Sequence, residues 1–415
     1  MRPLPNSTML AANRKCGVLI FLLTTILGCG DQRSEISSPT ESVAEINSAF
    51  ALDLYSRLKE NEGNVLFSPL NVSESFGILY LGARNVTERE LATTFHFNLP
   101  QEELRGVFAA LTSRMGKFGQ REDITLTFAN SIWCDRNYVL KKDFLSALTA
   151  SFQAEAYAVE FDGPPEAACN EINAWVSKKT NRKIRQSLMP SQIGANTRMV
   201  LCSAIYFNGH WAVQFDPKDT RTQQFFVAAQ QPVTIPMMHQ KSSFKTAHVD
   251  HFKLLELPYV GNDLSMIILL PDTYNGLSSL ESKFQTNNVR DWLSQLDQNP
   301  KQNTIVWLPR FRITQNIDLA NELVAMGAPS IFSAKDADLS GIAKEPGLCV
   351  SGVIHQSFIE VDEVGTKAAA ATSSSVKSRS MSDVFNADHP FIFLIRENRT
   401  GTILFLGRLS DPLKS

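Results

Sequence analysis

The chain has 415 residues, a formal net charge of −2 and 43% hydrophobic residues. This length would suit two or three domains, yet no compositional break, no Pro/Gly/Ser-rich linker and no internal repeat divides residues 42–360. One large domain with an extensive core is therefore expected. The near-neutral charge balance lacks a basic footprint, which argues against nucleic acid as a partner.

The first 28 residues resemble a signal peptide. They begin with positive charge, supplied by Arg2, Arg14 and Lys15, and continue with an apolar run over 18–27 that is too short to span a bilayer. The run ends in Leu27-Gly28-Cys29, which resembles a bacterial lipobox, whose cysteine is lipidated and becomes the new N-terminus. We expect an exported protein anchored by lipid on Cys29 to a bacterial membrane or cell surface, with residues 29–41 as a polar tether. An ordinary secretory signal with a chance cysteine is the alternative.

Four cysteines remain in the mature chain beyond Cys29. They are widely spaced and match no metal-binding pattern: Cys134, Cys169, Cys202 and Cys349. Disulfides are possible in an exported protein. Cys202 and Cys349, however, lie in apolar, strand-like runs, which favours small buried core residues.

Helical signals dominate residues 42–190. Ser42-Val43-Ala44-Glu45 is a capping box that predicts the start of a helix, and a helix is expected over 73–82. Thr87-Glu88-Arg89-Glu90 is a second capping box. The first helix has apolar residues at helical spacing, namely Val43, Ile46, Phe50, Leu54 and Leu58.

Strand signals dominate the later part of the chain. Apolar residues alternate from Ile124 to Phe128, which predicts a half-buried strand. A similar alternation runs from Ile305 to Ile313, and Pro309 within it argues for an edge strand or a bulge. A helical half followed by a strand-rich half indicates an α+β fold.

Motifs of catalysis are absent from the sequence. It contains no G-x-S-x-G, H-E-x-x-H, P-loop or G-x-G-x-x-G pattern. His239 and the pair His248 and His251 have no third metal ligand at a suitable spacing, so surface or strand histidines are expected. The sequence therefore predicts a protein that is not an enzyme and has no cofactor or metal.

The segment 362–380 is small, polar and poor in charge, and apolar runs follow it at 391–395 and 402–406. A long soft loop between strands of one domain is uncommon and usually functional. Alternate residues are small and uncharged, so the segment could form a strand that enters a sheet without overpacking it. A disordered surface loop with chance alternation is the alternative.

The flanks of this loop closely resemble the serpin family of protease inhibitors. Residues 358–372 resemble the strand and hinge that lead into a serpin reactive loop, and 389–395 and 401–408 resemble the strands that follow it. Further serpin-like motifs occur at 64–70, 204–211, 256–259 and 337–342. The resemblance covers about residues 42–412. It implies the serpin α+β fold over 42–415, with a large mixed central sheet, additional sheets, and an exposed reactive loop at about 363–384.

The resemblance implies a buried polar cluster, the family's shutter, beneath the main sheet. By motif position its members would be Ser68, Asn71, Ser203 and His355. The family usually has serine where this chain has Asn71 and asparagine where it has Ser203. A compensated exchange that keeps the hydrogen-bond network is our interpretation, because a buried amide and a buried hydroxyl both need partners. Two independent changes that weaken the cluster are the alternative.

The resemblance also implies a mechanism. A target protease attacks the loop, and the cleaved loop then enters the central sheet before the acyl-enzyme is hydrolysed. Counting along the loop places the cleaved bond at Arg379–Ser380, with Lys377–Ser378 as a secondary candidate, and both suit a monomeric inhibitor of trypsin-like serine proteases. The hinge is small and flexible, comprising Glu363, Gly365, Thr366, Ala368, Ala369, Ala370, Ala371 and Thr372. A non-inhibitory serpin, acting in binding or as a chaperone-like protein, is the competing function.

Overall fold

The computed structural model describes residues 39–185, 187–365 and 383–414, with the backbone alone for 39–42. The predicted signal peptide, Cys29 and most of the predicted tether lie outside these residues. In the described residues, no helix combines the length and the apolar character that a membrane crossing requires.

Helices occupy much of the first half of the chain. Their bounds are α1 Pro39–Leu58, α2 Pro69–Gly82, α3 Asn85–Thr94, α4 Gln101–Phe118, α5 Lys142–Phe152, α6 Pro165–Lys179, α7 Leu277–Ser282, α8 Thr286–Gln298 and α9 Ala320–Met326, with single 3₁₀ turns at Pro190–Gln192, Pro217–Asp219 and Ser330–Phe332. Helix α2 starts as its sequence directs, because the Ser68 hydroxyl accepts from the Asn71 amide and proline occupies the first position.

Both predicted capping boxes are wrong. Helix α1 begins at Pro39, so Ser42 already lies inside it. Helix α3 begins at Asn85, and Thr87 lies within its first turn. The Thr87 hydroxyl instead contacts the Ser330 hydroxyl at 3.0 Å and accepts from the Asp338 amide at 3.0 Å. The Thr87 hydroxyl therefore makes tertiary contacts with Ser330 and Asp338 instead of capping its own helix.

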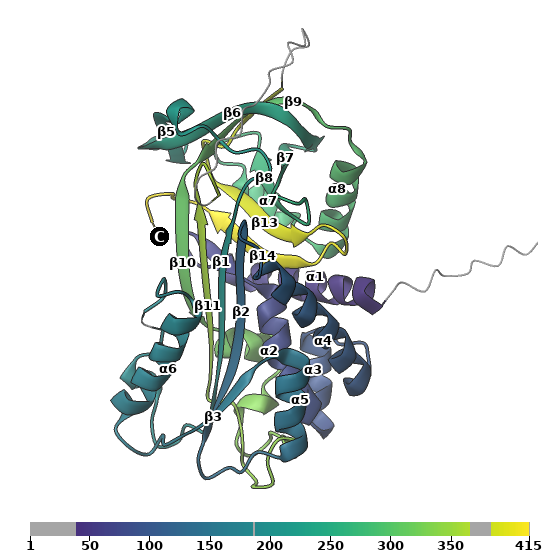
Figure 1. Cartoon of the computed structure of the whole chain (residues 1–415), viewed down its shortest axis with the longest axis vertical. Coiled ribbons are helices and arrows are strands. Elements are labelled where there is room, and N and C mark those ends of the chain that lie inside the picture. The colour runs from purple at the N-terminus through teal and green to yellow at the C-terminus, as the bar shows by residue number, and fades with distance from the viewer. Residues whose placement is uncertain (1–38, 186, 366–382, 415) are drawn as a thin grey trace, which may run out of the picture. The chain divides into compact units, whose positions relative to one another are not determined.

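A five-stranded sheet forms the centre of the described part of the chain (Figure 1). Its order is β10 (Phe311–Asp318), β11 (Gly352–Val361), β4 (Met199–Gly209), β2 (Ile124–Asp135) and β3 (Glu155–Val159). Strand β11 runs antiparallel to β10 but parallel to β4, whereas β2 and β4 are antiparallel. The strand predicted from the alternation at 124–128 is the beginning of β2 and is confirmed.

A second sheet contains nine strands within the described residues. Eight follow the order β1 (Val65–Phe67), β14 (Ile403–Leu409), β13 (Phe391–Glu397), β8 (Leu264–Pro271), β7 (Phe252–Pro258), β6 (Gln231–Val249), β9 (Gln302–Pro309) and β12 (Asp383–Asn386), and β5 (Arg221–Ala228) pairs with β6. The apolar runs after the loop are β13 and β14. Both are buried along their whole length, as their sequences suggest.

The alternation predicted as one strand from Ile305 to Ile313 is two strands in two different sheets. Strand β9 ends at Pro309 in the nine-stranded sheet, and β10 begins at Phe311 in the five-stranded sheet. Proline has no amide hydrogen to continue a ladder, so the chain changes sheet there. The predicted edge or bulge is thus a crossing point, and Arg310 is the residue at which the chain crosses.

The two faces of the five-stranded sheet are covered differently. Helix α2 packs against β2 and β4 on one face, and α6 packs against the same two strands on the other (Figure 1). Side chains of β4 alternate between the faces: Ser203 and Ile205 point to the α2 side, and Cys202, Ala204 and Tyr206 belong to the cluster under α6. The strand is buried throughout because both faces are covered.

The four cysteines within the described residues are all buried and unpaired: Cys134, Cys169, Cys202 and Cys349. Cys134 and Cys202 lie in β2 and β4 of the five-stranded sheet, and Cys169 lies in α6. This agrees with the interpretation of small core residues. Burial raises the pKa of the Cys134 thiol to about 12 and also raises the pKa of the Cys202 thiol, so both stay protonated at neutral pH.

Candidate functional site

The C-terminal end of β11 is held tightly where the predicted hinge begins. Glu363 is only 4% exposed, and its carboxylate accepts a hydrogen bond from Arg310 Nε at 2.6 Å. The Thr220 hydroxyl donates to the same oxygen. The Phe215 amide donates to the Glu363 carbonyl at 2.9 Å. Arg310 lies between β9 of the nine-stranded sheet and β10 of the five-stranded sheet, and its side chain therefore holds Glu363, the first hinge residue, at the point where the chain passes between the sheets.

Gly365 adopts a conformation that other residues rarely use. Its φ is +75°, and a Cβ atom there would lie 2.0 Å from the carbonyl oxygen of Gly209 at the end of β4. The Trp211 amide donates to the Val364 carbonyl at 3.2 Å, and Trp211 Nε1 donates to the Asp362 carbonyl at 2.9 Å. The chain turns here against the end of β4, and only glycine can make that turn.

The boundary between β4 and β11 is a parallel pair, which we call the seam. It runs from Val200 beside Gly352 to Phe207 beside Ile359. On the α6 side, Tyr206 stacks on Phe358 across the seam with ring centroids 5.4 Å apart. Lys183 lies 5.1 Å above the Phe358 ring and pairs with Glu360 at 3.1 Å. The two strands are therefore paired along the whole seam, and Lys183 covers the end of the seam that lies near Phe358 and Glu360.

His355 lies at the middle of the seam and is completely buried. Its Nε2 accepts from the Ser68 amide at 2.9 Å, so Nδ1 carries the proton and donates to the Ser203 hydroxyl at 2.8 Å. Burial lowers the pKa of His355 from 6.5 to about 3, which keeps the ring neutral. The structure thus brings three of the four predicted shutter residues into contact, from the N-cap of α2, from β4 and from β11.

Asn71, the fourth predicted shutter residue, contacts Ser68 through its backbone amide, but its side chain binds elsewhere. Its side-chain amide donates to Asn130 Oδ1 at 2.8 Å, and the Ser75 hydroxyl donates to the same oxygen at 2.8 Å. Asn130 lies on β2 directly opposite Ser203 on β4. The chain therefore has a buried asparagine beside Ser203, but it is supplied by the neighbouring strand rather than by position 203.

Sequence reasoning missed a buried carboxyl next to this cluster. Glu74 is 1% exposed, and it accepts from the Thr112 hydroxyl at 2.9 Å and from Asn130 Nδ2 at 3.3 Å. Burial raises the pKa of Glu74 from 4.5 to about 8, although both hydrogen bonds lower it. The signal in the sequence was the spacing of Asn71, Glu74 and Ser75, which places three polar groups on one face of an otherwise buried helix.

The remaining predicted site residues lie outside the described residues. They comprise the rest of the hinge and both candidate bonds, namely Thr366, Ala368, Ala369, Ala370, Ala371, Thr372, Lys377, Ser378, Arg379 and Ser380. The described chain ends at Gly365 beside β4 and resumes at β12, which pairs with β9 of the other sheet.

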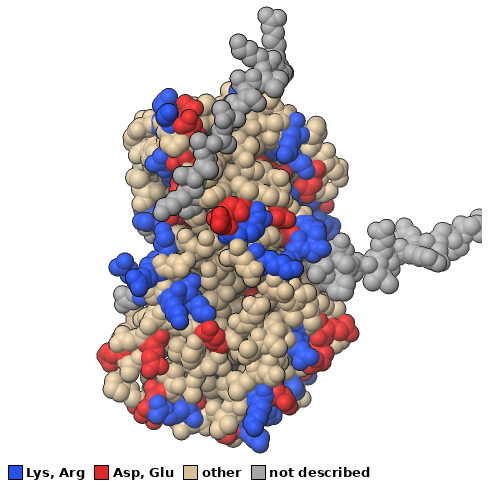
Figure 2. Space-filling view, viewed as in Figure 1, with Lys and Arg blue, Asp and Glu red and all other residues tan. Residues whose placement is uncertain are grey.

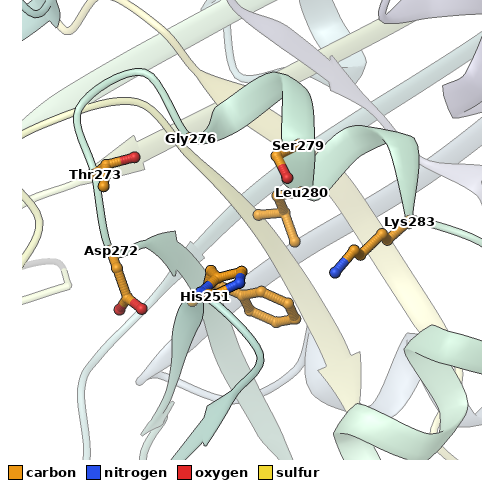
Figure 3. Close-up of a pocket in the computed structure, with 8 residues that line it drawn as sticks. His251, Asp272, Thr273, Gly276, Ser279, Leu280 and Lys283 are labelled. Atoms are coloured by element: carbon orange, nitrogen blue, oxygen red, sulfur yellow. The ribbon is translucent and has the colours of Figure 1, made fainter.

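The histidines considered as metal ligands have other contacts. His239 packs on Trp307 with ring centroids 4.2 Å apart, and His248 pairs with Asp272 at 2.9 Å. Within the described ranges, no group of three potential ligands is close enough to hold a metal ion. His251 lines a pocket of about 220 Å³, in which Asp272 and Lys283 lie on opposite sides (Figure 3). Asp272 is hydrogen-bonded to His248, and Lys283 forms an ion pair with Asp250.

Surface charge follows no single sign. Lys and Arg are interspersed with Asp and Glu over the face in Figure 2. On and after α4, Arg105 pairs with Glu102 and Arg121 pairs with Asp123 and Asp263. Arg114 pairs with the buried Glu397. Each of these three arginines therefore forms an ion pair within the chain, and the pair of Arg105 and Glu102 does so at the surface.

Comparisons with known proteins agree on one family. A family model described as serpin (serine protease inhibitor) matches residues 45–412. Serpin B3 of Homo sapiens is 36% identical over 391 residues, which cover 89% of this chain and 100% of the relative. Leukocyte elastase inhibitor of Equus caballus is 36% identical over 382 residues, covering 90% and 100%. A crystal structure of uncleaved ovalbumin has a TM-score of 0.82 at 28% identity, covering 89% and 100%.

Proposed function

This chain belongs to the serpin family, and from that membership we propose that it is a suicide inhibitor of trypsin-like serine endopeptidases. The protease serine attacks the Arg379 carbonyl, the amine of Ser380 leaves with a proton, and Arg379 remains bound to the enzyme as an ester. Insertion of the cleaved loop into the five-stranded sheet then displaces the enzyme before water can hydrolyse that ester. Relatives named as inhibitors of leukocyte elastase support the inhibitory class.

The parallel seam is the observation that carries this proposal. The described five-stranded sheet has two parallel pairs, β4 with β11 and β2 with β3. Of these, the pair of β4 and β11 contains the strand that leads into the loop. A chain that turns back at Gly365 would run antiparallel to both strands. One parallel pairing would then become two antiparallel pairings, which are slightly more stable per residue. The gain in hydrogen bonds and burial is the driving force for insertion.

The loop composition supports easy entry. The residues that follow Gly365 include a run of alanines, Ala368–Ala371. Alternate positions from Thr366 to Thr372, which would share one face of an inserted strand, have no bulky side chain that would resist packing between neighbours. The hinge begins directly after the anchor formed by Glu363, Arg310 and Thr220. Bending at Gly365 therefore allows the loop to move while β11 stays in place.

Specificity for basic residues rests on Arg379. Trypsin-like proteases have a carboxylate at the base of a deep pocket, and the guanidinium matches that carboxylate in charge and geometry. Lys377 would serve the same class of protease if Lys377–Ser378 were the cleaved bond. Both candidates thus lead to one protease class.

We also propose that the chain is exported and held at a bacterial membrane by lipid on Cys29. The apolar run over 18–27 followed by Leu27-Gly28-Cys29 supports this, together with the polar residues that separate Cys29 from the domain. The lipid would tether a monomeric inhibitor while leaving its loop free to meet a protease.

Mixing the mature chain with trypsin tests the inhibitory function. We expect a covalent complex that survives boiling in detergent, and a released C-terminal peptide that begins at Ser380 by mass spectrometry. Cleaved protein should also melt at a much higher temperature than intact protein, because a strand has been added to the sheet. Arg379→Ala should abolish the complex, and Lys377→Ala is the matched control that should retain it.

A second variant separates inhibition from simple cleavage. Thr366→Arg places a charge where the loop must become buried, and desolvating that charge opposes insertion. We expect trypsin to cleave this variant without forming a complex. If wild-type protein is itself cleaved without a stable complex and without a rise in melting temperature, the non-inhibitory function replaces the one proposed.

A further inference from the structure

Helix α2 grips the central sheet on both sides of the seam. At its N-terminus, the Ser68 amide donates to His355 on β11 at 2.9 Å. One turn further on, Asn71, Glu74 and Ser75 bind Asn130 on β2 through three hydrogen bonds of 2.8, 3.3 and 2.8 Å. Strand β4 lies between these two attachments, because the sheet order is β11, β4, β2.

Opening the seam must break one of these attachments. A strand inserted between β4 and β11 moves them apart by a further strand spacing, about 4.8 Å. Hydrogen bonds near 3 Å cannot stretch by that amount. The bond between Ser203 and His355 crosses the seam and breaks in any case. In addition, either His355 leaves Ser68 or α2 releases Asn130. The second group contains a carboxyl, and its protonation state changes the free energy of the closed arrangement.

The environment of Glu74 contains no countercharge that the structure describes. Helix α4 presents the neutral Thr112, β2 presents Asn130, and β4 and β11 present Ser203 and the neutral His355.

Charged side chains on the elements packed against α2 are bonded to groups other than Glu74. The arginine nearest to Thr112 along α4, Arg114, is paired with Glu397. From α1, Asn47 bonds to the Ile403 carbonyl of β14, and the buried residues of α5 are Phe144, Leu148 and Phe152. On α3, Glu90 bonds to the Ser330 amide.

We propose that Glu74 is a proton-dependent clasp: its neutral acid tolerates burial beside Asn130 and leaves the seam closed, whereas its carboxylate is destabilised by burial without a countercharge and favours release of β2 and opening of the seam. The clasp rests on the proposed function, since it acts on the insertion step. Glu74 is a positioning residue, because it touches neither the loop nor a protease. No other described member of the α2–Asn130 group is ionisable.

Linkage fixes the direction of the effect. Burial holds the pKa of Glu74 at about 8 in the closed sheet, and the pKa falls toward its ordinary value when opening admits water. Between those two values the open form binds fewer protons than the closed form, so opening becomes more favourable as pH rises. The increase is at most about tenfold per pH unit. Above pH 8 both forms are ionised, and the pH dependence ends.

Peptide annealing measures seam opening without any protease. The probe is an N-acetylated synthetic peptide with the sequence of residues 366–379, added to the intact mature chain between pH 6.5 and 9.5. Burial keeps His355 neutral in the closed form throughout this range. Protonation of a hydrated His355 near pH 6.5 would favour opening at low pH, which is the opposite of the direction expected for Glu74. We expect the annealing rate, followed by native gel electrophoresis, to rise several-fold toward pH 8 and then to level off. Glu74→Gln mimics the neutral acid, so its rate should stay at the low-pH value throughout.

Two further variants distinguish titration from a structural effect. Thr112→Val removes a hydrogen bond that lowers the pKa of Glu74, so the rate should level off at a higher pH than in the wild type. Glu103→Gln changes an exposed glutamate on α4 and should leave the profile unchanged. A flat wild-type profile, or a Glu74→Gln profile that rises like the wild type, overturns the clasp. Annealing with normal pH dependence but no trypsin complex would instead refute only the proposed inhibition.

Discussion

Two buried ionisable groups in the central cluster respond to pH in opposite directions. The folded-state pKa of Glu74 is raised to about 8, so the stability it supports is complete below its ordinary value of 4.5 and is lost as pH rises toward 8. The folded-state pKa of His355 is lowered to about 3, so its contribution is complete above 6.5 and is lost as pH falls toward 3. Between pH 4.5 and 6.5 the two slopes offset each other.

Removing the histidine should therefore expose the slope due to Glu74. In His355→Gln, the unfolding free energy should increase as pH falls from 6.5 to 4.5, by about 1.4 kcal/mol per pH unit, whereas the wild type should stay nearly level. Urea unfolding at a series of pH values measures this difference. His96→Gln, an exposed histidine paired with Asp53, is the control that should behave as the wild type. Parallel pH profiles for His355→Gln and wild type would contradict the opposed pair.

The hinge is held by contacts at the ends of strands β9 and β4. Pro309 ends β9 and Arg310 carries the chain into the other sheet, where its guanidinium binds Glu363 at the start of the hinge. Two residues later, Gly365 turns against the end of β4. The sequence indicated a proline irregularity and a hinge glycine separately. Their proximity depends on the pairing of β10 with β11, which no local pattern specifies.

A side chain at Gly365 should loosen this anchor. Gly365→Ala combines a left-handed φ, which costs roughly 1–2 kcal/mol for an L-residue, with a clash against the Gly209 carbonyl. We expect a lower urea midpoint in denaturation followed by circular dichroism. Gly352→Ala is the matched control, because a Cβ there meets no atom within 4 Å and its φ is not left-handed. Equal midpoints for the two variants would show that the turn at Gly365 is not strained by a side chain.

At the scale of the whole molecule, local signals and motifs each predicted part of the fold. Helical and strand signals indicated the helical half and the later strands, and the serpin-like motifs indicated the paired strands after the loop. His355, which the resemblance assigns to the shutter, lies beside Ser68 and Ser203. The resemblance could not place Asn130 or Glu74 beside the shutter, since their contacts join α2, α4 and β2 across long sequence separations. The exchange of residue types at 71 and 203 was visible, but the partner that completes the cluster was not.

The lipid anchor is a prediction about where the whole molecule resides. Expressed in a bacterium, the full chain should partition into detergent and incorporate labelled fatty acid, since a lipidated N-terminus adds about 0.8 kcal/mol of membrane affinity per buried methylene. Cys29→Ser should lose both properties, and Cys16→Ser, within the signal, should retain them. A wild-type chain that stays in the aqueous phase would leave the ordinary secretory signal as the explanation.

The buried thiol of Cys202 has a consequence of its own. It lies on β4 next to Ser203, on the face under α6, and burial alone raises its pKa. Only the thiolate reacts, so the closed sheet keeps this sulfur chemically silent. Each excursion that admits water to the strand restores ordinary reactivity for as long as it lasts. The extent to which a thiol reagent has modified Cys202 should therefore increase with the total time that the sheet has spent open.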